Sequence, residues 1–258
     1  MPESGKRLLK RHYGPMTDSI KKIIKFFFRI LKVDIRRTPE YERNKFLWVK
    51  DFNINTIIDI GAHVGRFTLE ISRILPDTKI YSFEPIKDVY EELLRNCRNI
   101  NNFQGFNIAL GNFNGNAKIH RNKFLPSSSM LEVGDLHIEA FPFTREIHDE
   151  EIVVRKFDDV VIEEDLQLDP EILIKLDVQG YEDTVIQGGI DTFKKASVIM
   201  TEVSYYELYK GQVLFDEVYN QLGKMGFRYK GSINSLFHPI KGLLLSSDAV
   251  FVRERADI

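Results

Sequence analysis

The chain has 258 residues, of which 43% are hydrophobic and 12% aromatic, and its 36 basic and 38 acidic side chains leave a net charge of −2. This composition excludes intrinsic disorder, which requires few aromatic residues and a high net charge. A single cysteine, Cys97, excludes an internal disulfide, no run of about 18 apolar residues predicts a membrane span, and the first residues do not resemble a signal peptide. We therefore expect a cytoplasmic protein with one large domain and an appendage.

The appendage carries most of the positive charge. Residues 1–37 hold eleven basic and three acidic side chains, a net charge of +8, whereas the remainder of the chain has a net charge of −10. Residues 18–32 predict an amphipathic helix with isoleucine and phenylalanine on one side and lysine and arginine on the other. Such a helix either caps the main domain or lies in a membrane interface as a peripheral contact. We place the boundary between a basic helical extension, residues 1–50, and the main domain, residues 51–258.

From residue 55 onward, β-branched runs alternate with helical patterns. Strands are predicted at 56–60, 79–83, 105–110, 172–176, 197–203, 227–230 and 249–253. Strands that alternate with helices predict an α/β fold with a doubly wound, mostly parallel sheet, and the last strand runs antiparallel because no helix precedes it. Residues 111–165 interrupt this alternation, and we expect extra strands and a loop over the active face there.

A glycine turn follows the first predicted strand. Its sequence is Asp59-Ile-Gly61-Ala62-His63-Val-Gly65, which lacks the Gly-x-Gly-x-x-Gly fingerprint of dinucleotide-binding proteins. Glycine at both positions permits a tight turn and a close approach of the backbone to a ligand. Glu84 ends the second strand, where a carboxylate is placed to accept hydrogen bonds from both hydroxyls of a ribose.

Five segments together resemble a known family. They match the pattern of class I S-adenosylmethionine-dependent methyltransferases and, in finer detail, the FkbM family, in the expected order over residues 54–204. The segments are Asp59-Ile-Gly-Ala-His-Val-Gly65, Phe83-Glu-Pro85, Asn107-Ile-Ala-Leu-Gly111, Lys175-Leu-Asp-Val-Gln-Gly-Tyr-Glu182 and Glu202-Val203. Tyr181 departs from the pattern because the family usually has a small residue there, which predicts a pocket of altered shape.

The resemblance implies a Rossmann-like fold, S-adenosylmethionine as cofactor and O-methylation as the reaction. It also implies the residues that bind the cofactor, through the glycine turn at the methionine part, the end of the second strand at the ribose and the third strand at the adenine. These residues are Asp59, Gly61, Ala62, His63, Gly65, Glu84, Pro85, Asn107 and Ala109.

Three carboxylates are the candidate catalytic residues. Asp177 closes the fourth predicted strand and Glu202 the fifth, so both are expected at the carboxyl edge of the sheet. The pair either binds a divalent cation such as Mg²⁺, or one acts as general base while the other binds the ammonium group of the cofactor. Glu182, in the next helical turn, either joins them or suits the helix dipole. We assign no metal ligands, because no His/Cys cluster has zinc spacing.

The acceptor is expected to carry a hydroxyl, because no Asn-Pro-Pro-Tyr run of the kind typical of nitrogen methylation follows the fourth strand. By analogy with the family, a sugar of a glycolipid or polysaccharide is the preferred acceptor. A small natural product is the nearest alternative. Two further alternatives are a binding module without catalysis and a nucleic-acid methyltransferase that uses residues 1–37 as a binding arm, although a single basic helix on an acidic body makes nucleic acid an unfavoured partner. The sequence leaves the oligomeric state open.

Overall fold

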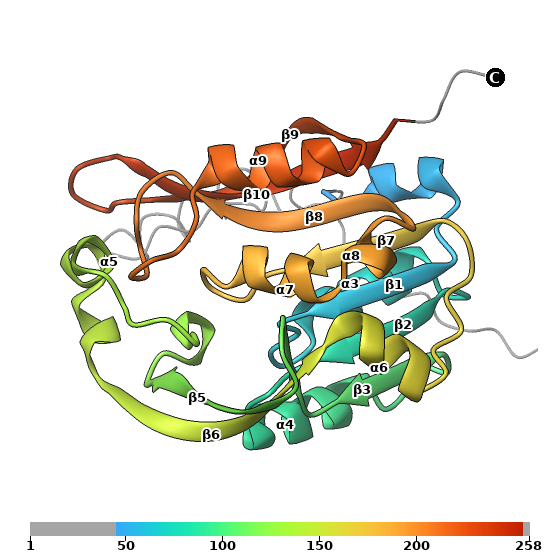
Figure 1. The fold of residues 1–258 in the computed structure, drawn as a ribbon, viewed down its shortest axis with the longest axis horizontal. Coiled ribbons are helices and arrows are strands. Elements are labelled where there is room, and N and C mark those ends of the chain that lie inside the picture. Colours follow the sequence, from blue (N-terminus) through green and yellow to red (C-terminus); the bar gives the residue numbers. More distant parts are fainter. Residues whose placement is uncertain (1–44, 255–258) are drawn as a thin grey trace, which may run out of the picture. The chain divides into compact units, whose positions relative to one another are not determined.

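The computed structural model describes residues 45–254, whose main sheet has the strand order β3-β2-β1-β7-β8-β10-β9 (Figure 1). Strands β3 to β8 of this sheet pair in parallel, and β10 is antiparallel to both of its neighbours. The strands are β1 (Thr56–Ile60), β2 (Lys79–Phe83), β3 (Phe103–Phe106), β7 (Ile172–Leu176), β8 (Ala196–Ser204), β9 (Phe227–Phe237) and β10 (Leu244–Arg253). The predicted doubly wound, mostly parallel sheet with an antiparallel last strand is therefore confirmed.

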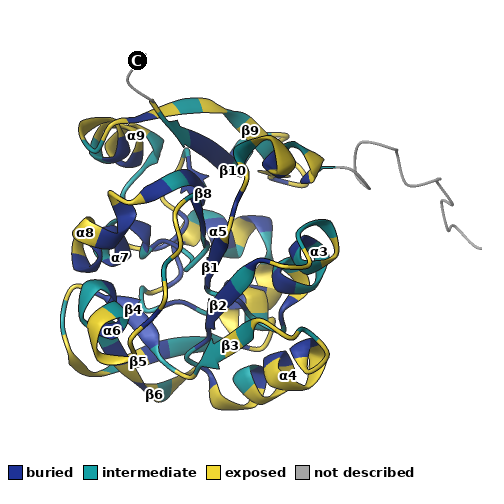
Figure 2. Ribbon diagram, turned by 90° about the vertical axis from the view of Figure 1, so that its right-hand side faces the viewer, coloured by how far each residue is buried: buried dark blue, intermediate teal, exposed yellow. Residues whose placement is uncertain are grey.

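Helices cover both faces of this sheet. The 3-10 helix η1 (Leu47–Phe52) and the helices α3 (Arg66–Ile74) and α4 (Lys87–Cys97) lie on one face, and α6 (Phe157–Glu163), α7 (Glu182–Gly188), α8 (Ile190–Phe193) and α9 (Phe215–Lys224) lie on the other. Side chains of a strand alternate between faces, so Ile57 packs with η1 and α3 while Ile58 packs with α6 to α9. All five residues of β1 are consequently buried, as Figure 2 shows for the centre of the sheet.

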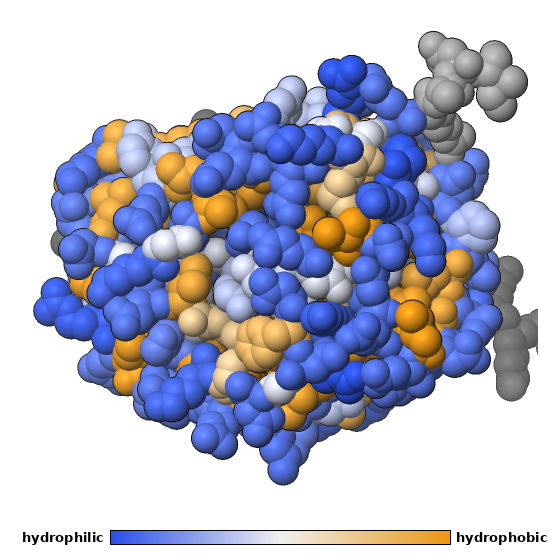
Figure 3. Space-filling model, in the orientation of Figure 1, coloured by the Kyte–Doolittle hydropathy of each residue, from blue (hydrophilic) through white to orange (hydrophobic). Residues whose placement is uncertain are grey.

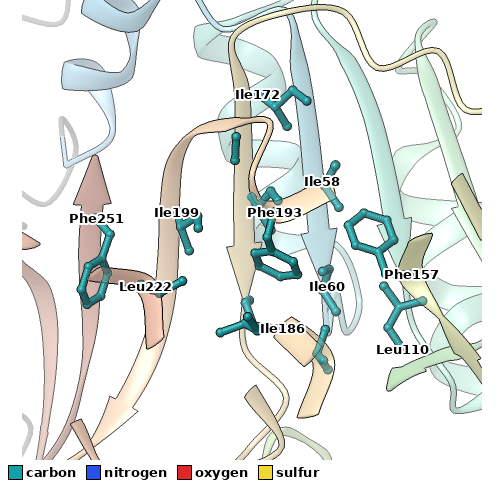
Figure 4. Packing of buried hydrophobic residues seen from close by; sticks show 14 of the residues in the cluster. Ile58, Ile60, Leu110, Phe157, Ile172, Ile186, Phe193, Ile199, Leu222 and Phe251 are labelled. Atoms are coloured by element: carbon teal, nitrogen blue, oxygen red, sulfur yellow. The ribbon is translucent and has the colours of Figure 1, made fainter. Parts of the chain in front are cut away.

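An aromatic cluster joins the second set of helices to the sheet. The ring of Phe157 lies edge-on to Phe83 of β2 and to Phe193 of α8, at centroid distances of 5.7 and 6.1 Å. Ile186 of α7 and Ile58 of β1 belong to the same core (Figure 4). Close packing of this kind resists movement, so it holds the ends of the strands in a defined relation to one another.

The segment between β3 and β7 folds over the carboxyl ends of the main strands (Figure 1). It contains a small sheet of order β4-β6-β5, formed by β4 (Ala109–Gly111), β5 (Gly115–Asn122) and β6 (Ile147–Lys156), together with η2 (Leu125–Ser127), α5 (Asp135–Ala140) and η3 (Pro142–Arg145). Arg121 of β5 ties the sheet to α4 through both oxygens of Asp88, at 2.8 and 2.6 Å, and also binds Glu150 at 2.9 Å. The predicted extra strands over the active face are thus present.

One predicted strand was wrong in its extent. Residues 105–110 do not form a single strand, because the chain leaves the main sheet after Phe106 and re-enters at Ala109 in the small sheet. Asn107 lies at this break, and its side-chain Nδ2 donates to the carbonyl oxygens of Glu84 and Pro85 at 3.0 and 2.8 Å. Strands β9 and β10 are longer than predicted, because polar residues extend them beyond their apolar parts.

The compact unit that the structure describes begins at Phe46, whereas the sequence placed the boundary at residue 51. Phe46 and Val49 are both buried against β1 and α3, so η1 packs as part of the main domain. The predicted amphipathic helix at 18–32 lies outside the described residues, and so does its membrane contact. Within residues 45–254, no helix has the length and apolar character needed to cross a membrane.

A close crossing of backbones predicts the effect of one substitution. A Cβ at Gly188 in α7 would lie 1.7 Å from the carbonyl oxygen of Gly111, so Gly188→Ala must push α7 away from β4. We expect a loss of about 2–4 kcal/mol in the free energy of unfolding. Gly223→Ala in α9 is the matched control, because nothing lies within 4 Å of its added Cβ, and it should stabilise by about 0.5–1 kcal/mol. Urea denaturation measures both, and equal effects would contradict this packing.

Candidate active site

A cavity lies at the carboxyl ends of β1 and β2, where the small sheet and the loop after β7 cover them. It has a volume of about 760 Å³ when the open solvent at its mouth is included. We call it the first cavity, and its lining comes from five stretches of chain. These are the glycine turn with Gly61 and His63, the stretch 83–86, the stretch 108–110, the segment 125–130 with Ile119, and the loop after β7 with Asp177, Val178, Gln179 and Tyr181.

The glycine turn is shaped by contact with the loop after β7. Gly61 has a φ of +75°, and a Cβ there would lie 1.9 Å from the carbonyl oxygen of Asp177. Only glycine fits this position, because both the backbone conformation and the space exclude a side chain. The amides of Gly61 and Ala62 each donate to the carbonyl oxygen of Phe83 at 3.0 Å. The turn is therefore fixed against β2 on one side and β7 on the other.

Below this turn, Lys175 and Asp59 form a buried pair. Asp59 is fully buried, accepts a hydrogen bond from Thr68 at 2.8 Å and lies 3.6 Å from the Lys175 ammonium group. Lys175 also contacts Asp177 at 3.2 Å and donates to the carbonyl oxygen of Gly61 at 3.3 Å. Burial raises the pKa of Asp59 against the opposing effect of Lys175. Burial alone would lower the pKa of Lys175, but the two carboxylates outweigh it and the pKa is raised. Asp59 thus supports the turn from beneath.

Glu84 lies inside the first cavity and is only 5% exposed. Its Oε2 accepts the backbone N–H of His63 at 3.0 Å, and its Oε1 accepts that of Ile86 at 2.9 Å. Burial raises its pKa to about 7 despite these two hydrogen bonds, each of which favours the ionised form. The carboxylate is therefore held in a single orientation, with a lone pair on each oxygen left for a ligand.

The other predicted cofactor residues divide into two groups. Pro85 and Ala109 line the first cavity together with Gly61, His63 and Glu84. Ala62, Gly65 and Asn107 are not among its described lining residues: Ala62 packs against Leu93, Gly65 begins α3, and Asn107 holds the carbonyl groups of residues 84 and 85. These three shape the stretches that line the cavity.

Two of the three predicted catalytic carboxylates meet through a residue that the sequence did not single out. The Nε2 of Gln179 donates to Asp177 Oδ1 at 2.7 Å and to Glu202 Oε2 at 2.8 Å. Its Oε1 accepts a hydrogen bond from the hydroxyl of Tyr209 at 2.8 Å, and its backbone carbonyl accepts one from Ser129 at 2.6 Å. Gln179 also has a φ of +55°, which is uncommon outside glycine, asparagine and aspartate. Gln179 lies in the family segment 175–182, which was the signal in the sequence, but no role was assigned to it there.

Glu202 opens into a second cavity on the other side of Gln179. This second cavity encloses about 890 Å³, including its mouth, and Gln179 and Pro126 line both cavities. The Oε1 of Glu202 accepts a hydrogen bond from Ser246 at 2.9 Å. Burial raises the pKa of Glu202 well above its usual value, and the neighbouring carboxylates, Asp177 first among them, raise it further. The two cavities thus meet at Gln179, with Asp177 on one side and Glu202 on the other.

The family can be assigned from the sequence that builds this site. The family model of the methyltransferase FkbM domain matches residues 59–229, from the buried Asp59 into β9. The chain belongs to the FkbM methyltransferase family. The resemblance seen in the five motifs is therefore confirmed, and the match contains the glycine turn, Glu84, Asp177, Gln179 and Glu202.

Two relatives show how far the similarity extends. The chain is 29% identical over 164 residues to the 2-O-methyltransferase NoeI of Sinorhizobium fredii, which is 61% of this chain and 66% of that protein. It is 27% identical over 143 residues to Methyltransferase 1 of Beauveria bassiana, which is 51% of this chain and 57% of that protein. The chain therefore spans just under two thirds of the first relative and little more than half of the second.

Solved structures with similar folds include two methyltransferases. The FkbM methyltransferase of Methylobacillus flagellatus is 13% identical, with 78% of this chain and 44% of that chain covered and a TM-score of 0.46. A putative methyltransferase of Streptococcus mutans in complex with SAH is 12% identical, with 85% of this chain and all of that chain covered and a TM-score of 0.44.

The divalent cation considered for the FkbM-family site is not supported. In the described part of the chain, no group of three or more His, Cys, Asp or Glu side chains is arranged to hold a metal ion. The two carboxylates Asp177 and Glu202 instead share the amide of Gln179, and Asp177 is paired with Lys175. Hydrogen-bond donors and an ammonium group of the chain thus occupy the positions that a cation between the carboxylates would need.

Glu182 turns away from both cavities. It is 5% exposed, and its Oε1 accepts the backbone N–H of Val178 at 3.0 Å, which closes the loop between β7 and α7. Burial raises its pKa to about 7. The side chain therefore holds the loop that carries Asp177 and Gln179, and its position supports a structural role rather than contact with a substrate.

This position predicts different outcomes for two substitutions. Glu182→Ala leaves the buried amide of Val178 without an acceptor and should cost about 1–3 kcal/mol in the free energy of unfolding. Glu182→Gln keeps an acceptor. Because the pKa of Glu182 is raised in the folded state, its contribution to stability is fully present at low pH and is lost as pH rises through about 7. Urea denaturation should therefore show that the free energy of unfolding decreases less between about pH 5 and pH 8 for Glu182→Gln than for the unmodified protein. Identical decreases would contradict this role.

Proposed function

We propose that this protein is an S-adenosylmethionine-dependent O-methyltransferase that acts on a hydroxyl group, in a sugar of a glycolipid or polysaccharide. The observation that carries the proposal is the pair of cavities that meet at Gln179, one built on the glycine turn and Glu84, the other open to Glu202. A methyl-transfer enzyme needs this arrangement, because the acceptor and the donor must be aligned on either side of the transferred group.

The residues of the first cavity fit S-adenosylmethionine. The turn at Gly61 has no side chain that would obstruct a ligand, and Glu84 keeps one lone pair on each oxygen, which suits the two hydroxyls of a ribose. His63 lines the same cavity, and its buried Nε2 has no hydrogen-bond partner in the described part of the chain. When bound, the cofactor supplies a methyl group on a sulfonium sulfur.

Asp177 is suited to bind the ammonium group of the cofactor. Its side chain is 35% exposed and lines the first cavity, and Lys175 and Gln179 hold both of its oxygens in place. A carboxylate held in this way loses little conformational freedom when it binds a cation. This supports the alternative in which the two carboxylates divide the work, with Asp177 on the cofactor and Glu202 on the acceptor.

Glu202 is suited to be the general base. A hydroxyl must lose its proton to become a methyl ether, and Glu202 Oε would accept that proton at the end of the second cavity nearest Gln179. A carboxylate with a raised pKa is a stronger base than an exposed one, so the burial that raises the pKa of Glu202 favours this role. The name of the relative NoeI, a 2-O-methyltransferase, also supports oxygen as the acceptor atom.

The first test is calorimetric titration of the full chain with S-adenosylmethionine and S-adenosylhomocysteine. Micromolar binding of both is the expected result. Well-folded protein that binds neither would overturn the proposal and favour a binding module without catalysis. Binding of both together with methyl transfer to RNA, and to no sugar, would favour the nucleic-acid alternative.

The raised pKa of Glu84 predicts a pH-dependent affinity. The ionised carboxylate accepts hydrogen bonds from ribose hydroxyls, and with a pKa of about 7 its ionised fraction rises about tenfold from pH 6 to pH 8. The Kd for S-adenosylhomocysteine should therefore fall about tenfold over that range. Glu84→Gln should bind more weakly at pH 8, by about 1–3 kcal/mol, and lose the pH dependence. Parallel pH profiles for the two proteins would remove Glu84 from the cofactor site.

Removal of the proposed base should affect turnover alone. Glu202→Gln keeps a similar shape, with an oxygen to accept from Gln179 and an NH2 group to donate to the hydroxyl of Ser246, so S-adenosylhomocysteine should bind with unchanged affinity. Methyl transfer from radiolabelled S-adenosylmethionine to methyl glycosides should fall by about 10²–10⁴-fold in kcat. Full turnover in this variant would exclude Glu202 as the base.

A further inference from the structure

The second cavity has two chemically different walls. One wall is aromatic and includes Phe124, Phe141 and Phe143, whose rings form a continuous series with centroid distances of 5.3 and 6.0 Å. The other part of the lining is polar and includes Glu202, Asp248 and the side-chain amide of Asn234, which donates to Asp248 at 2.5 Å. These walls come from the segment 124–143 and from β8, β9 and β10, which lie far apart in the sequence.

His137 adds an unpaired polar group to the aromatic wall. It lines the second cavity and is 4% exposed, and its buried Nδ1 has no hydrogen-bond partner among residues 45–254. Its ring lies edge-on to Phe141 and Tyr209, at centroid distances of 5.6 and 5.2 Å. Burial lowers the pKa of His137 to about 4, so the imidazole is neutral near pH 7. A buried polar nitrogen of this kind is costly, so a small rearrangement that gave it a partner would be favourable.

The charge of the cavity limits its ligand. None of its lining residues, all of which belong to the described part of the chain, is lysine or arginine, whereas Glu202 and Asp248 contribute carboxylates. A phosphate or carboxylate on the ligand would meet only like charge there, which disfavours nucleotides, nucleic acids and acidic sugars. The cavity therefore suits an uncharged molecule that presents many hydroxyls to one wall and an apolar surface to the other.

The exposed fractions of two aromatic side chains agree with a ligand that has an apolar surface. Phe124 and Phe143 are 49% and 55% exposed at the mouth of the cavity, which is much for side chains of this size. The face of the molecule drawn in Figure 3 is otherwise mainly hydrophilic, with hydrophobic side chains in small groups. Exposed aromatic rings beside a cavity with polar groups are typical of a ligand site.

We propose that the second cavity binds the acceptor as an uncharged pyranose, with its C–H face on the rings of Phe141 and Phe143 and its hydroxyls toward Glu202, Asp248 and Asn234. The proposal rests on the proposed function, because it takes the first cavity as the cofactor site. Gln179 and Pro126 form the junction across which one hydroxyl of the sugar reaches the first cavity. Glu202 then lies at the junction, while the aromatic wall decides which rings fit.

The test is saturation-transfer-difference NMR on the full chain, with methyl α-D-mannopyranoside and methyl α-L-rhamnopyranoside as uncharged probes. Transfer to the ring protons is expected for at least one of them. Phe143→Ala should reduce this transfer roughly fivefold or more, as for other aromatic anchors. Phe237→Ala is the matched control, because Phe237 is 53% exposed on β9 but does not line the cavity, and it should leave the transfer unchanged.

A charged probe tests the electrostatic part. Mannose 6-phosphate should give at least about tenfold weaker binding than the methyl mannoside, because the described lining residues offer its phosphate two carboxylates and no cation. The proposal would be overturned if mannose 6-phosphate and the methyl mannoside bound equally well, or if neither uncharged glycoside gave a transfer signal. It would also be overturned if Phe143→Ala kept the full signal, or if Phe143→Ala and Phe237→Ala lost equal amounts of it.

The same samples separate this proposal from the proposed function. S-adenosylhomocysteine should bind the Phe143→Ala and Phe237→Ala variants with the affinity of the unmodified protein, since neither residue lines the first cavity. The protein could bind a glycoside in a way that depends on Phe143 and yet not bind S-adenosylhomocysteine. This result would support the sugar site and overturn the proposed methyltransferase function. Binding of S-adenosylhomocysteine without any glycoside signal would overturn the sugar site alone.

Discussion

The site depends on the contacts that the buried ammonium group of Lys175 makes with its neighbours. Asp59 and Lys175 face each other across the β1–β7 pair, and Asp177 follows two residues later, so one cation joins two carboxylates and the carbonyl oxygen of Gly61. A buried charge of either sign is costly without its partner, so each of these groups requires the others. The same contacts hold the glycine turn and the loop after β7 together at the carboxyl edge of the sheet.

The loop after β7 connects these contacts to both cavities. Its backbone touches the turn at Gly61, the carboxylate of Glu182 holds its amide at Val178, and Gln179 extends from it between Asp177 and Glu202. One side chain thus bridges the carboxylates of Asp177 and Glu202. A network in which the donors of Gln179 and its acceptor Oε1 are all used favours a single arrangement of the junction.

Burial gives the carboxylates of this edge an unusual proton affinity. The pKa values of Glu84 and Glu182 are both raised to about 7, and that of Glu202 is raised further by its acidic neighbours. Each shift makes the ionised form less favourable, so the folded protein gives up stability near neutral pH to keep these groups in place. Raised pKa values of this kind gather at sites that exchange protons or bind polar ligands. The pKa of Glu182, which accepts the backbone N–H of Val178 and lines neither described cavity, is raised by the same burial.

The sequence by itself determined the alternation of strands and helices, the antiparallel last strand, the glycine turn and the places of Glu84 and Asp177 directly after strands, whereas Glu202 lies two residues before the end of β8. These features follow from local patterns, since hydrophobic period and strand ends are read from neighbouring residues. Only the tertiary structure decided that β3 ends before Asn107, that Glu182 turns back to Val178, and that Gln179 joins the carboxylates. It also decided the second cavity, whose walls come from residues 124–143 and 202–248. Contacts between segments so distant in the chain depend on how the small sheet packs over the main one, which no local pattern encodes.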